Sequence, residues 1–205
     1  MNPIIEKSLK HSMTYQEYID LIKQLVQKNG TTGFEKTEAN IKYTKLNERR
    51  MSRWAKTLNL NDEVIEAAQR LHDHVTWLVI VESWCGDAAH VLPVFNKLAN
   101  TNQKIDLRIV LRDENEDLMN MFLTNETRSI PKLIMINDET EEVTDTYGPR
   151  PSEATKYVND FKAMHGKLTL EFKEELQRWY NQNKGENIIE DLTKMLCAVE
   201  PNICQ

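Results

Sequence analysis

The sequence predicts an α/β protein with a mixed sheet, and two observations support that fold class. Between residues 73 and 166, short apolar runs rich in β-branched residues alternate with segments of helical periodicity. The last two of these runs, 131–136 and 142–146, are separated only by a polar turn, which is typical of a hairpin. A parallel crossover followed by an antiparallel hairpin makes a mixed sheet.

Composition limits the possible partners. The chain has 205 residues, 40% of them hydrophobic and 28% charged, with a net charge of −6. An acidic chain lacks the basic surface that nucleic acids or anionic membranes attract, so we expect neither as a partner. The N-terminus has no signal-peptide core, no apolar stretch approaches a membrane span, and three cysteines do not suggest a secreted disulfide framework. We therefore expect a cytoplasmic protein with reduced thiols.

Helices are predicted both before and after the core along the chain. The first follows a capping box at Thr14–Glu17 and stops at Asn29-Gly30, and 31–42 is expected to be an exposed connection. Two more helices are expected over 44–58 and 61–72, and others after Gly166. The predicted organisation is an N-terminal helical extension (1–72), a core (73–166) and a C-terminal helical extension (167–205). Arg49, Arg50 and Arg53 are expected on a solvated helix face rather than at an anion site.

The core elements follow in a fixed order. We expect a strand at 75–81, a helix to about residue 100, a strand at 105–111, a helix at 114–123, the hairpin strands at 131–136 and 142–146, and a helix from Ser152.

Cys85 lies at the turn between the first core strand and the helix that follows it. Unpaired backbone N–H groups and the positive end of the helix dipole favour a thiolate at such a position. The sequence therefore predicts a reactive sulfur.

Three motifs carry a family likeness. Trp84-Cys85-Gly86, with Pro93 eight residues past the cysteine, resembles the active-site strand and kinked helix of thioredoxins. Ser129-Ile130-Pro131 resembles the cis-proline loop of that family. The resemblance implies a thioredoxin-like fold with a mixed four-stranded sheet, a cis Pro131 beside the sulfur, and substrate docking against Trp84, Gly86, Ile130 and Pro131.

The departures from the family pattern bear on function. Ala88 stands where thioredoxins carry a second cysteine, and Val79 where they usually carry a buried aspartate. Attack on a disulfide would therefore stop at the mixed disulfide unless another thiol resolves it. The turn also differs from the Cys-Gly-Phe-Ser of monothiol glutaredoxins, so no iron–sulfur cluster or other cofactor is expected.

The sequence allows two roles for the Asp87 side chain. Its charge would raise the thiol pKa or allow it to act as a local base, which makes it a candidate catalytic residue beside Cys85. It could equally cap the first turn of the helix. The sequence leaves both open.

The other cysteines and the histidines give weaker signals. Cys204 is expected on a tail that could reach the active site or pair with Cys197, although a buried Cys197 and an incidental Cys204 are favoured. No histidine has metal-ligand spacing with a cysteine, so no metal site is expected. His90 is more than a helical turn past Cys85, too far for a direct base.

Two functions remain. One is thiol–disulfide exchange through Cys85 on a protein or low-molecular-weight substrate, with an external thiol as resolver. The other is a redox-inactive module that binds a protein or peptide in the groove beside Pro131. The retained thiol slightly favours the first. The apolar faces of the extensions indicate that they pack on the core or on a second copy and enclose Cys85, and the oligomeric state stays open.

Overall fold

The computed structural model describes residues 1–200 and 203, and its centre is a five-stranded mixed sheet in the order β1-β3-β2-β4-β5. The strands are β1 (Met13–Thr14), β2 (Val75–Val81), β3 (Ile105–Leu111), β4 (Lys132–Asn137) and β5 (Glu142–Tyr147). β2 runs parallel to β3 and antiparallel to β4, and β4 runs antiparallel to β5. The predicted mixed sheet with its hairpin is therefore confirmed.

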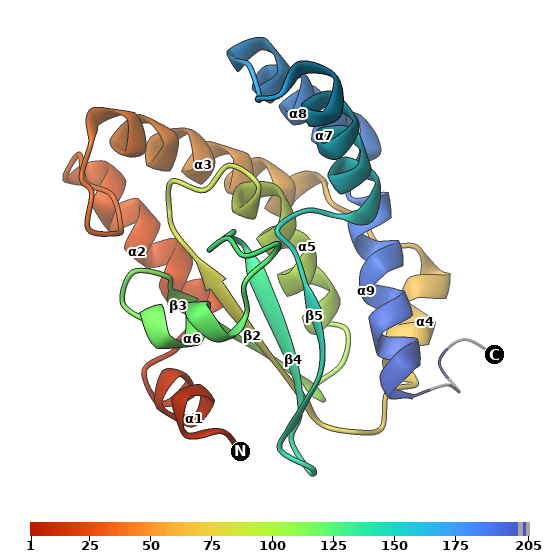
Figure 1. Cartoon of the computed structure of the whole chain (residues 1–205). Coiled ribbons are helices and arrows are strands. Elements are labelled where there is room, and N and C mark those ends of the chain that lie inside the picture. Colours follow the sequence, from red (N-terminus) through yellow and green to blue (C-terminus); the bar gives the residue numbers. More distant parts are fainter. Residues whose placement is uncertain (201–202, 204–205) are drawn as a thin grey trace.

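Helices surround much of this sheet, while the turn between β4 and β5 protrudes beyond them (Figure 1). They are α1 (Pro3–Lys10), α2 (Tyr15–Gln27), α3 (Glu38–Thr57), α4 (Asp62–Gln69), α5 (Ala88–Ala99), α6 (Glu116–Met121), α7 (Ser152–His165), α8 (Leu170–Asn183) and α9 (Glu186–Val199). α3 and α9 both pack against α5, and α9 also contacts α4 and α7. Within the described part of the chain, no helix is long and apolar enough to cross a membrane.

The sheet gains one strand over the predicted four. Met13 and Thr14 pair antiparallel with Ile109 and Arg108, which places β1 at the edge. A two-residue strand directly before a helix is too short to leave an alternating pattern in the sequence.

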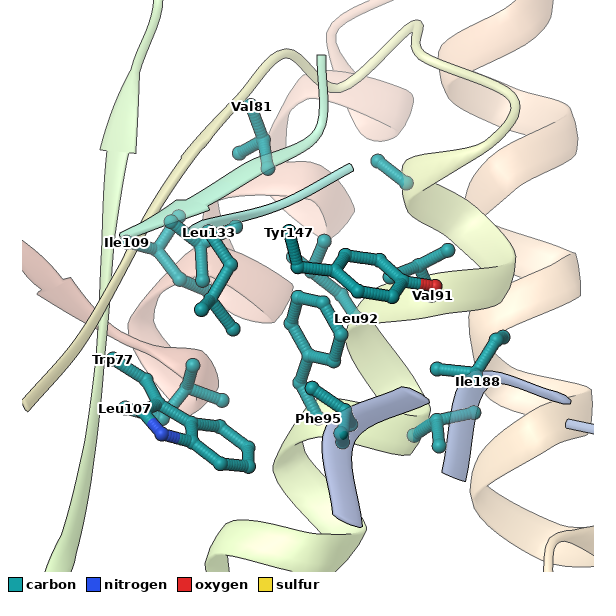
Figure 2. Packing of buried hydrophobic residues seen from close by; sticks show 14 of the residues in the cluster. Trp77, Val81, Val91, Leu92, Phe95, Leu107, Ile109, Leu133, Tyr147 and Ile188 are labelled. Carbon is teal, nitrogen blue, oxygen red and sulfur yellow. The ribbon is translucent and has the colours of Figure 1, made fainter. Parts of the chain in front are cut away.

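The core lies between the sheet and α5. Figure 2 shows Trp77, Leu107 and Leu133 turned toward Leu92 and Phe95 of α5, and all but Leu107 are fully buried. Every residue of β2 is buried, because β3 and β4 cover both of its edges and helices cover its faces. A central strand of this kind needs apolar residues at successive positions, which explains its continuous apolar run.

The connection between α2 and α3 differs from its prediction. It was expected to be exposed, but Thr31 and Thr32 are buried, and α3 already begins at Glu38. The Ser83 hydroxyl accepts the Thr32 backbone N–H (3.0 Å) and lies 3.3 Å from the Thr31 hydroxyl. Buried hydroxyls require such partners, and these partners are about fifty residues away in the sequence.

The packing of both sets of helices agrees with the expected enclosure of Cys85, whose exposed fraction is 7%. The division of the chain into a core at 73–166 and two extensions stays a prediction.

Two loops meet beside the start of β4. The Ile130–Pro131 peptide bond is cis, as expected, and so is Gly148–Pro149. Gly148 has φ +112°, and a Cβ at this position would lie 2.2 Å from the Pro131 carbonyl oxygen. Only glycine allows this contact between the two loops.

Gly148→Ala is expected to lower the free energy of unfolding by roughly 3 kcal/mol or more, because a methyl group would collide with backbone. Gly166→Ala is the matched control, since Gly166 also has positive φ (+75°) but has nothing within 4 Å of the added methyl. It should cost only about 1 kcal/mol. Chemical denaturation measures both, and equal losses would show that the contact with Pro131 does not constrain the loop.

Candidate functional site

Cys85 lies on the floor of a groove of about 630 Å³, which we call the Cys85 groove. Residues of α3 and of α8 with its preceding loop line it from two sides, including the exposed apolar side chains Tyr43, Leu46 and Leu170. The floor consists of residues 84–87 together with Ile130, Pro149 and Arg150. The groove therefore depends on helices outside the sheet for most of its walls.

The turn that carries Cys85 is fixed from α3. The buried Asn47 side chain donates from Nδ2 to the carbonyl oxygens of Ser83 (2.9 Å) and Cys85 (3.1 Å). The Cys85 thiol in turn donates to the Ile130 carbonyl oxygen, with a separation of 3.2 Å. These contacts bring the cysteine turn and the cis-proline loop together, as the resemblance implies.

The thiol is held in its neutral form. Burial, followed by the nearby charge of Asp87, raises the pKa of Cys85 to about 12. Backbone N–H groups of Ala88 and Asp87 and the charge of Arg150 act in the opposite direction. The stabilisation expected from a helix N-terminus is therefore present, but desolvation outweighs it.

Asp87 occupies the N-cap position of α5. Its side chain makes no capping hydrogen bond. One carboxylate oxygen lies 2.8 Å from Arg150 Nη2, and the other accepts a hydrogen bond of 3.0 Å from the Tyr180 hydroxyl. Burial raises the pKa of Asp87, while Arg150 and Tyr180 lower it. Asp87 therefore stands at the helix N-terminus as the capping alternative expects, but its side chain joins three segments instead of bonding the first turn, and a catalytic role for it stays a prediction.

His90 is buried and structural. Trp54 Nε1 can only donate, so its 2.9 Å contact makes His90 Nδ1 an acceptor. The ring proton then sits on Nε2, which donates to Gln177 Oε1 at 2.8 Å. The ring stacks on Tyr180 with centroids 4.4 Å apart. Burial lowers the pKa of His90 to about 3, which agrees with the expectation that it is no direct base for Cys85.

The residues expected to dock a substrate are only partly assembled. Trp84, Gly86 and Ile130 line the Cys85 groove, and Arg112 stacks over the Trp84 ring, 5.0 Å from its centroid. Pro131 is buried and does not line the groove, whereas Pro149 does. In the sequence, the tyrosine-glycine-proline segment before Arg150 indicates only the end of a strand. The contribution of Pro149 to the groove was therefore not predicted.

Four side chains of the site were missed by sequence reasoning: Arg50, Arg150, Gln177 and Tyr180. Arg49 and Arg53 are exposed as expected, but Arg50 is half-buried and lines the groove, which corrects the prediction of a wholly solvated face. Helical spacing identifies the face that packs on the core, but it does not show that a second helix covers the flank beside it.

The remaining cysteines supply no free thiol in the described part of the chain. Cys197 is half-buried and disulfide-bonded, which differs from the reduced, buried residue that was favoured, and Cys204 lies outside the described residues. Cys85 is the free cysteine in the described part of the chain. Among residues 1–200 and 203, no three His, Cys, Asp or Glu side chains gather in a way that could hold a metal ion.

Comparison with known proteins gives a family and a fold. The thioredoxin family matches residues 33–165. A crystal structure of a protein of unknown function from Pseudomonas aeruginosa has a TM-score of 0.60 and 19% identity, covering 93% of this chain and 99% of its own. An HIV epitope-scaffold has a TM-score of 0.57 and 18% identity, covering 92% and 99%. A search of curated proteins found no match.

Asp87→Asn is expected to lower the pKa of Cys85, since it removes the carboxylate charge that opposes the thiolate and leaves Arg150 in place. The thiol pKa should still stay above the ordinary value of about 8.5, because burial remains. The alkylation rate of the Cys85 peptide against pH, read by mass spectrometry, measures it. Tyr180→Phe is the control: it removes a hydrogen bond to Asp87 but no charge, so it should shift the midpoint far less. An unchanged midpoint in Asp87→Asn would contradict the assignment.

His90 should make the protein less stable in acid. Its folded pKa of about 3 lies below the ordinary 6.5, so between these pH values the unfolded state binds more protons. The free energy of unfolding should therefore fall as pH drops through this window, with a slope of up to about 1.4 kcal/mol per pH unit from this residue. His90→Gln, compared by denaturation at each pH, should show a shallower fall. Parallel curves for the two proteins would refute the buried, neutral histidine.

Proposed function

The chain belongs to the thioredoxin family, and on that premise we propose that it binds a peptide segment of a partner protein in the Cys85 groove without redox turnover. The observation that carries the proposal is the buried thiol, with its pKa raised to about 12. At neutral pH such a group is almost entirely protonated, and the thiol is a poor nucleophile compared with the thiolate.

The absence of a nearby resolving thiol supports the same conclusion. Ala88 follows Cys85 at three residues, where a second cysteine would release a mixed disulfide. Cys197 is already disulfide-bonded. Within residues 1–200 and 203, a mixed disulfide on Cys85 would thus have no free thiol of this chain to resolve it.

The walls of the groove suit a peptide. Leu170 is 64% exposed, and Tyr43 and Leu46 are each 40% exposed, although all three line one groove. Large apolar side chains gathered around a groove, with polar groups at its rim, are typical of sites that bind another protein. A peptide would bury these side chains and leave the thiol as part of the floor.

Thiol–disulfide exchange through Cys85, resolved by an external thiol, remains the second candidate. One observation favours it: backbone N–H groups of Asp87 and Ala88 hydrogen-bond the sulfur, and each lowers the thiol pKa. A partner that opened the groove would expose the Cys85 thiol to water and leave these N–H donors in place, so the thiol pKa would fall.

Peptides selected from a random library on the immobilised protein should bind wild type and Cys85→Ser with equal affinity, because binding without turnover needs no sulfur. Leu170→Asp, which places a charge on an apolar wall, should weaken binding at least tenfold. Leu123→Asp is the matched control, since Leu123 is 41% exposed and lies outside the groove lining, and it should leave affinity unchanged. Fluorescence anisotropy of labelled peptides measures each affinity.

Two outcomes would overturn the proposal. If peptides are retained only as disulfides to Cys85 and are lost in Cys85→Ser, exchange is the function. If no library peptide binds wild type more tightly than Leu170→Asp, the groove is not a peptide site.

A further inference from the structure

Gln177 presents an unused donor to the Cys85 groove. Its Oε1 accepts the His90 Nε2 proton, and His90 is itself fixed by Trp54. This chain of hydrogen bonds from α3 through α5 to α8 determines which end of the amide faces the groove. The Gln177 Nε2 group then has no hydrogen-bond partner among residues 1–200 and 203.

Arg50 forms no ion pair with a carboxylate in the described part of the chain, although the charge of Asp87 attracts it without direct contact. Its Nη1 donates to Asn47 Oδ1 at 3.0 Å, and it forms no salt bridge within the described part of the chain. The side chain is half-buried, and burial lowers the pKa of Arg50, although a guanidinium stays charged at neutral pH. A partly desolvated cation of this kind gains free energy from an anion that enters the groove.

Gly86 leaves space between these two donors. A methyl group on Gly86 would lie 3.6 Å from Arg50 Nη1 and 3.9 Å from Gln177 Nε2, with no other atom within 4 Å. Both nitrogens therefore face the same small volume above the residue next to Cys85. These separations exceed a hydrogen-bond distance, so a two-oxygen group centred at this point would present a separate oxygen to each donor.

The other charges around the groove do not cancel this preference. Arg112, Arg128 and Arg150 also line it, and each is paired, with Asp113, Glu116 and Asp87 respectively. Lys173 and Glu174 line it too, and both are exposed. The carboxylate nearest the site, Asp87, is already held by Arg150 and Tyr180. Arg50 thus remains as a positive site in a chain whose net charge is −6.

We propose that Arg50 and Gln177 form a carboxylate-binding subsite above Gly86, one oxygen of the ligand accepting from each side chain. Two donors match the two oxygens of a carboxylate, whereas a phosphate group presents more acceptors than these side chains satisfy. The location rests on the proposed function, because the carboxylate would belong to the bound peptide, as an acidic side chain or as its C-terminus. The subsite itself is defined by the geometry of this chain alone.

Small capped probes test the subsite without a known partner. ¹⁵N-labelled protein is titrated with N-acetylglycine, which carries a C-terminal carboxylate, and with N-acetylglutamate α-amide, which carries a side-chain carboxylate. At least one should shift the Gln177 side-chain amide and Gly86 backbone resonances saturably, and the tighter probe identifies the source. The neutral N-acetylglutamine amide should cause no saturable shift. Arg50→Gln should weaken binding about tenfold or more, because it removes a charge-assisted hydrogen bond.

Two variants complete the test. Gly86→Ala fills the space without changing any charge, and its contacts of 3.6 and 3.9 Å are ordinary, so it should fold normally and lose binding. Arg49→Gln makes the same charge change on the adjacent exposed residue of α3 and should leave binding unchanged. The subsite is refuted if neither carboxylate binds, if Gly86→Ala binds as wild type does, or if inorganic phosphate binds more tightly than both probes.

The experiments distinguish failure of the carboxylate subsite from failure of the proposed peptide binding. If library peptides bind wild type and Arg50→Gln equally well, the proposed carboxylate subsite is refuted and the proposed peptide binding still holds. If the probes bind saturably but the groove binds no peptide, the carboxylate subsite is supported and the proposed peptide binding is refuted.

Discussion

The buried carboxylate of Asp87 is the constraint on which the Cys85 site depends. It meets Arg150 from the segment after β5 and Tyr180 from α8 at the start of α5, so one ion pair and one hydrogen bond join three distant segments. A buried charge is tolerated only when it is paired, and this pairing therefore fixes Arg150 and α8 beside the cysteine. Loss of Arg150 would leave the Asp87 charge uncompensated in a place that water barely reaches, whereas loss of the Tyr180 hydroxyl would remove one of its hydrogen bonds.

The same enclosure decides the chemistry of the thiol. A helix N-terminus and an arginine favour a thiolate at Cys85, and both are present, but burial and the Asp87 charge oppose it more strongly. Family membership thus supplies a cysteine in the expected position, while the surrounding helices set its protonation state. This is why the order of the two functional hypotheses reverses once the structure is known: the motif favours exchange, and the environment of the sulfur favours binding.

The fold was largely predictable because its signals are local. The apolar runs of β2 and β3 and the hairpin turn between β4 and β5 appear where the pattern places them. Strands and amphipathic helices leave periods of two and of about 3.6 residues in the sequence, and these periods need no knowledge of the partner element. Two features left no such local signal: β1 has only two residues, and Thr31 is buried among the hydroxyls of Thr44 and Ser83.

The sequence by itself determined the family, the order of the core elements and the position of Cys85 beside the cis Ile130–Pro131 bond. The tertiary structure alone decided what surrounds the sulfur: the pairing of Asp87, the neutral state of His90, and the convergence of Arg50 and Gln177 above Gly86. The physical reason is that local pattern encodes which face of an element is buried. Desolvation and charge pairing depend on which other elements come to cover that face, and those elements lie up to about a hundred residues away in the chain.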